Sequence, residues 1–155
     1  MLYMSLFDVI KYGNIDIQSE TELNELPPEV VKKWHARVVE HACQSAESIA
    51  HQDTSGKCQK LIDMTRKYMS GEVDKDALLA EKKTASYLVP KAYSTAAHFA
   101  SNAAYTPVNI SAYCAANAVR NAAYPAKDAD YAAIQLYKEW LIEELMNYDT
   151  EECVN

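Results

Sequence analysis

Apolar side chains recur every three or four residues along most of the chain, which is the spacing of one buried face on an α-helix. The clearest run spans residues 28–51 and begins at Pro28, a residue suited to the first turn of a helix. Its predicted buried positions are Val31, Trp34, Val38, Ala42, Ser45 and Ile49. Charged residues fall between them, so this helix is predicted to bury one face and hydrate the other.

Further segments with the same period follow, and residues that start or stop helices mark their ends. These residues are Gly71, Asp74, Pro90, Thr106, Pro107 and Pro125. Residues 52–56 have the composition of a loop. The last helix is predicted from about Asp128 to Leu145. Short connections between helices favour antiparallel neighbours.

The pattern predicts one all-α domain, an antiparallel helical bundle of about five main helices. Residues 1–27 are predicted to be an N-terminal capping segment that is partly helical and partly extended. Residues 28–147 are predicted to form the bundle, and residues 148–155 a frayed acidic tail. The composition agrees, because 155 residues with only three glycines and five prolines offer few of the turns that a β-fold needs. Alanine, the strongest helix former, dominates the second half.

The formal net charge of −7 makes free association with nucleic acid or anionic lipid unexpected. No apolar run approaches the roughly 20 residues that span a bilayer, and the apolar start lacks a basic region. A cytoplasmic protein is therefore expected. Four cysteines occur without a CxxC pair, so reduced thiols are predicted. They are Cys43, Cys58, Cys114 and Cys153.

Recognised catalytic motifs do not occur in the sequence: there is no GxSxG elbow, P-loop, HExxH or dinucleotide fingerprint. Glu47 and His51 lie four residues apart, one turn after Cys43, but we interpret them as capping and surface polarity rather than metal ligands. Lys57, Lys60, Arg66 and Lys67 are interpreted as solvent-facing charge. No cofactor or metal is predicted. The weakest alternative is an enzyme that uses His98 and Cys114, which lie on neighbouring predicted helices.

Two neighbouring predicted helices each carry a stripe of polar and aromatic side chains. The first stripe is His98, Asn102 and Tyr105. The second is Tyr113, Asn117, Arg120 and Tyr124. If the stripes faced each other, they would form a pocket able to stack on a flat ring and bind an anion. The alternatives are a hydrogen-bonded network between packed helices and a solvated helix face.

Three features follow one another in the middle of the chain: a cysteine-alanine-glutamate helix, an aspartate loop, and a helix ending in an aromatic residue and Gly-Glu. They are His41-Ala42-Cys43, Ala46-Glu47-Ser48-Ile49, Asp53, Leu61-Ile62 and Tyr68-Met69-Ser70-Gly71-Glu72-Val73. With the alanine-rich helices that follow, residues 34–145 resemble the immunity-protein-5-like family of immunity proteins. The resemblance implies a role in conflict between bacteria, or between bacteria and phages. The family's later helices are richer in histidine, so no site residue is transferred.

The leading hypothesis is a non-enzymatic binding protein, an immunity-like or phage anti-defence inhibitor that occupies a protein partner such as a toxin or a defence protein. A basic patch on the partner would meet an acidic surface of this chain. That surface is predicted at Glu20, Glu22, Glu25 and Glu29. The alternative is a helical module that sequesters a small, nucleotide-like molecule between the two stripes. A homo-oligomer is left open.

Overall fold

Five helices make up the described part of the computed structural model, which comprises residues 28–88, 91–106 and 108–123, with residues 136, 137, 139, 140 and 143. They are α3 (Pro28–Ala50), α4 (Lys57–Met69), α5 (Lys75–Leu88), α6 (Lys91–Tyr105) and α7 (Val108–Ala123). The described residues contain no strand. The predicted all-α bundle is confirmed. The predictions for residues 1–27 and 148–155 lie outside the described residues.

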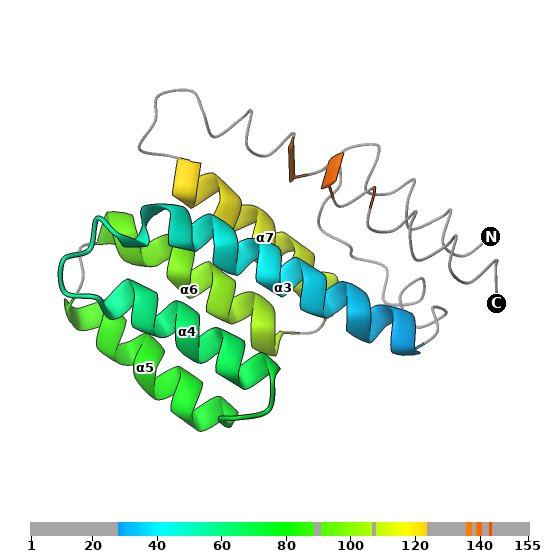
Figure 1. Ribbon diagram of the computed structural model, residues 1–155, viewed down its shortest axis with the longest axis horizontal. Helices are drawn as coiled ribbons and strands as arrows, with labels where there is room; N and C mark the ends of the chain where they lie inside the picture. The colour runs from blue at the N-terminus through cyan, green and yellow to red at the C-terminus, as the bar shows by residue number, and fades with distance from the viewer. Residues whose placement is uncertain are drawn as a thin grey trace.

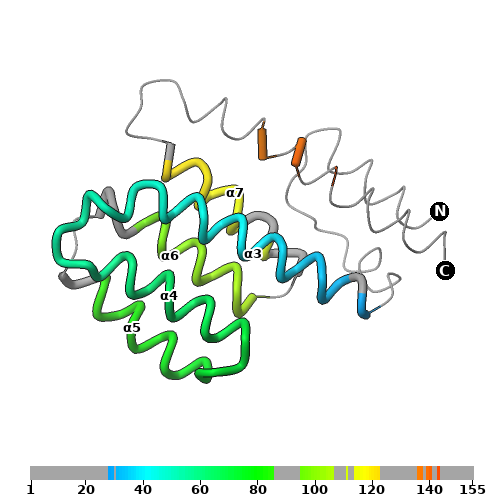
Figure 2. Tube along the Cα trace, in the orientation of Figure 1, coloured from blue at the N-terminus to red at the C-terminus, as the bar shows by residue number. Residues whose placement is uncertain are grey.

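The helices run up and down, each reversing the direction of the one before (Figure 1). The tube shows short turns between α3 and α4 and between α4 and α5 (Figure 2). Helix α6 lies in the middle and contacts α3, α4, α5 and α7. The N-terminal part of α3 extends beyond the ends of α4 and α6 in the view of Figure 1.

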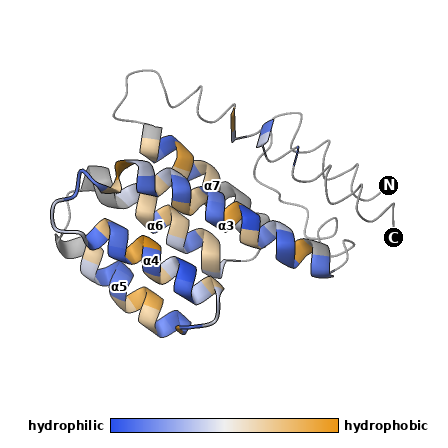
Figure 3. Ribbon diagram, in the orientation of Figure 1, coloured by the Kyte–Doolittle hydropathy of each residue, from blue (hydrophilic) through white to orange (hydrophobic). Residues whose placement is uncertain are grey.

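The core combines large side chains on α3, α4 and α5 with alanines on α6 and α7. Trp34, Leu61 and Leu78 are almost fully buried. Among the described side chains of α6, all the buried ones are small, namely Ala96, Ala97, Ala100, Ser101, Ala103 and Ala104. Small side chains let helix axes approach closely, so the alanine-rich central helix can touch four neighbours. In Figure 3 hydrophilic positions are more evident on α4 and α5 than on the central α6.

Helix α4 starts at an unusual cap. Gly56 precedes it with a φ of 74° and supplies no side chain to the free N–H groups of the first turn. Asp53, a buried residue of the preceding loop, supplies it instead: its Oδ2 accepts from the Cys58 N–H at 2.9 Å. Its Oδ1 accepts from the Ser55 N–H and hydroxyl, so one carboxylate ties the loop to the helix.

Three further predicted helix boundaries agree with the structure, while Pro90, Pro107, Pro125 and Asp128 lie outside the described residues. Gly71 follows α4 with a φ of 82°, the left-handed conformation that glycine tolerates best. Asp74 caps α5, where its Oδ1 accepts from the Ala77 N–H at 2.8 Å. Helix α7 begins at Val108, directly after the Thr-Pro pair that predicted the start of a new helix.

The C-terminal end of α6 is held by side chains of two neighbouring helices. The Ala103 carbonyl lies in the last turn, where carbonyls lack a helical partner. It accepts hydrogen bonds from His35 Nε2 of α3 and from the Ser111 hydroxyl of α7, both at 2.9 Å. This carbonyl therefore connects three helices.

A short C-terminal piece packs against the middle of α3. Tyr137 is 1% exposed, and the Trp140 ring stacks on His41 with 4.2 Å between ring centroids. The Tyr137 ring also lies against the His41 ring, with 5.3 Å between their centroids. These aromatic residues cover part of the bundle core. Within the described ranges, no helix combines the length and apolar character that a bilayer-crossing segment requires.

Candidate functional site

The first polar stripe, on α6, faces α5. Lys82 of α5 donates hydrogen bonds to Asn102 Oδ1 and, at 2.9 Å, to the Tyr105 hydroxyl oxygen. The Tyr105 hydroxyl donates in turn to Asn102 Oδ1 at 2.6 Å. The His98 Nε2 lies 3.0 Å from the Lys82 carbonyl oxygen. His98, Asn102 and Tyr105 therefore lie together as predicted and form a polar network between α5 and α6.

A second lysine joins this network from the start of α5. The Lys75 Nζ lies 5.2 Å from the centroid of the Tyr105 ring, and the Lys82 Nζ lies 5.4 Å from it. An aromatic ring attracts cations at this distance because its face carries partial negative charge. Two ammonium groups therefore lie near the half-buried Tyr105 ring.

In the second stripe, on α7, Arg120 does not face the first stripe. Ser111 points to α6, since its hydroxyl donates to the Ala103 carbonyl. Arg120 follows Ser111 by about two and a half helical turns, which places it on the opposite side of α7. It is exposed, so the expected convergence of Arg120 with the α6 stripe is wrong. The reason is the rotation of α7 about its axis, which its alanines set by packing on α6.

Of the other residues predicted to form a site, some are described in the structure and some are not. Asn117 is half-buried, and its carbonyl accepts from the Asn121 amide at 2.7 Å. Tyr124 and the side chain of Tyr113 lie outside the described residues. So do Glu20, Glu22 and Glu25 of the predicted acidic surface. Glu29 is exposed in the first turn of α3.

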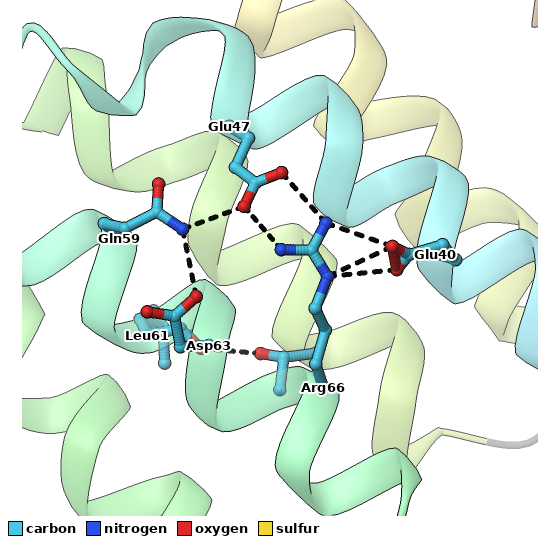
Figure 4. A network of polar contacts seen from close by, with 7 residues as sticks. Glu40, Glu47, Gln59, Leu61, Asp63 and Arg66 are labelled. Atoms are coloured by element: carbon cyan, nitrogen blue, oxygen red, sulfur yellow. Dashed lines mark hydrogen bonds and ion pairs between the residues drawn. The ribbon is translucent and has the colours of Figure 1, made fainter.

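Among the described residues, the densest ionic cluster joins α3 and α4 around Arg66 (Figure 4). The Arg66 guanidinium lies between two carboxylates that are two turns apart on α3. Its Nε donates to both Glu40 oxygens at 3.1 Å, and Nη2 donates to Glu47 Oε1 at 2.9 Å. Nη1 donates to the other Glu47 oxygen. The Gln59 amide extends the cluster by donating to Glu47 at 2.8 Å and to Asp63 at 3.0 Å.

These contacts shift the acid–base equilibria of the two main partners. Hydrogen bonds from Arg66 hold the pKa of Glu47 below its ordinary value. Hydrogen bonds to Glu47 and then to Glu40 raise the pKa of Arg66, so the guanidinium stays charged. The interpretation of Arg66 as solvent-facing charge, and that of Glu47 as capping polarity, are wrong. The only sequence signal for this cluster is the pair of glutamates seven residues apart on α3, and it does not indicate which basic residue binds them.

Glu40 lines two hollows in the described part of the structure. One of about 300 Å³ lies between α3 and the end of α4. It is lined by Ala36, Val39, Glu40, Arg66, Met69 and Ser70. The other, of about 120 Å³, is lined by Arg37, Glu40, His41, Gln44 and Trp140. The charged groups that line the first hollow, Arg66 and Glu40, bind each other. We therefore interpret the cluster as a structural link between α3 and α4.

The buried thiols are poorly suited to nucleophilic catalysis. Cys43, Cys58 and Cys114 are buried and form no disulfide within the described residues, while Cys153 lies outside them. Burial raises the pKa of both Cys43 and Cys58 to about 12. Burial also raises the pKa of Cys114, which has 6% exposure. Because the thiolate is the nucleophile, a raised pKa argues against the Cys114 enzyme hypothesis.

Among the described residues, no three histidine, cysteine, aspartate or glutamate side chains are grouped so that they could hold a metal ion. Comparisons with family models, curated proteins and solved structures give no match to this chain. The fold therefore defines the class, an all-α helical bundle. The immunity-protein-5-like resemblance stays a prediction.

Proposed function

We propose that this chain is a non-enzymatic binding protein that inhibits a protein partner by occupying it, as an immunity-like or phage anti-defence protein would. The single observation that carries the proposal is the distribution of charge along the chain. Residues 28–123, which hold α3 to α7, contain 12 basic and nine acidic residues, a net charge of +3. The other 59 residues contain three basic and 13 acidic residues, a net charge of −10.

Acidic charge concentrated outside residues 28–123 can direct the docking of a basic partner. Opposite charges on two surfaces steer their encounter and align them, and they discriminate against partners of the wrong sign. Glu20, Glu22 and Glu25 belong to the acidic N-terminal stretch, and Glu29 continues it onto the exposed first turn of α3. A toxin or defence enzyme with a basic active-site cleft would be occluded by such a surface.

The described bundle supplies a scaffold rather than a reaction centre. Its charged groups join helices, as Arg66 joins α3 to α4 and Lys82 joins α5 to α6. Its thiols have raised pKa values. A rigid scaffold favours tight binding, because less conformational entropy is lost when the complex forms.

The test begins with purification of the tagged full chain from its native host and native mass spectrometry of what accompanies it. The identified protein is then produced separately, and its affinity is measured against the wild type and against a variant with Glu20, Glu22, Glu25 and Glu29 changed to lysine. We expect the affinity to fall by about 100-fold or more, since four attractive charge pairs would become four repulsions. Stoichiometric addition of wild-type chain should abolish the partner's own activity.

A matched variant controls for total charge. It reverses four other exposed acidic residues, Glu72, Asp76, Glu139 and Glu143, and should keep the affinity within about threefold. Equal losses in both variants would reject this surface. A small molecule that co-purifies in place of a protein, and is released on denaturation, would instead favour the ligand-sequestering alternative.

A further inference from the structure

We draw no further inference here: the strongest candidate, the hollow of about 300 Å³ between α3 and the end of α4, has an apolar wall of Ala36, Val39 and Met69 beside the Arg66–Glu40 ion pair, and nothing in the described part of the structure shows what covers it.

Discussion

At the scale of single residues, Asp53 shows how one side chain can replace a cap that the helix itself lacks. Burial acts to raise the pKa of Asp53, but hydrogen bonds from Ser55 and Cys58 outweigh it and hold the pKa below the ordinary value. The carboxylate is therefore charged at neutral pH, which strengthens its bonds to the N–H groups at the start of α4.

We predict that Asp53→Ala lowers the free energy of unfolding by about 1–2 kcal/mol, because a buried N–H group at Cys58 loses its acceptor. Urea denaturation followed by circular dichroism measures the change. Asp74→Ala removes the exposed cap of α5 and serves as the comparison, with an expected loss of about 0.5–1 kcal/mol. Equal losses at the two sites would show that the burial of Asp53 adds nothing.

The lowered pKa of Glu47 predicts that the folded protein is less stable in acid. Its pKa is lower in the folded chain, so its ion pair with Arg66 stabilises the protein above a pH of about 4.5 and loses this effect as the pH falls further. In Glu47→Gln this part of the pH dependence should disappear. The free energy of unfolding at pH 7 should fall by about 0.5–1 kcal/mol, a small loss because the ion pair is partly exposed. Unfolding titrations between pH 3 and pH 7 check both statements. An unchanged acid profile would contradict them.

The lowered pKa of His35 predicts a separate loss of stability at a less acidic pH. Burial lowers its pKa, although the bond to the Ala103 carbonyl partly opposes this. The unfolded chain takes up the proton near pH 6.5 while the folded chain does not, so stability should decrease as the pH falls below about 6.5. His35→Gln should flatten the stability profile between pH 6.5 and pH 5. His51→Gln, at an exposed position, should leave that profile unchanged.

At the scale of helices, α6 is defined by the small residues that let it lie at the centre. Its buried alanines contact α7, whose own buried residues include Ala115, Ala116 and Ala118. Two helices that meet through alanines have no flexible side chains to rearrange when volume is added.

Ala100→Leu should therefore destabilise the bundle by about 1–3 kcal/mol, even though leucine favours helices. Ala80→Leu on the exposed face of α5 is the matched control and should stay within about 0.5 kcal/mol of the wild type. Thermal unfolding of both variants measures how much each substitution changes the stability. A tolerated leucine at position 100 would mean that α6 and α7 are not closely packed.

At the scale of the whole molecule, residues 28–123 carry a net charge of +3 and the rest of the chain a net charge of −10. For the proposed inhibitor, raising NaCl from 50 to 500 mM should slow association with the basic partner by about tenfold and change dissociation much less. Stopped-flow mixing measures the two rates. An association rate independent of salt would contradict electrostatic docking.

Much of the helical architecture could be predicted, because it depends on neighbours in sequence. The three-to-four spacing around Trp34 and Val38, the left-handed Gly71 and the Asp74 cap act over a few residues. The predicted α6 stripe also holds, since His98, Asn102 and Tyr105 share a face through helical geometry alone. Such features need no knowledge of the tertiary structure.

The partners of those side chains were decided only by the tertiary structure. Arg66 and Glu47 are 19 residues apart, and His35 and the Ala103 carbonyl are 68 apart. The α6 stripe meets Lys82 of α5 rather than Arg120 of α7 for the same reason. A helical period defines which residues share a face, but the rotation of each helix against its neighbours depends on how all the side chains pack together.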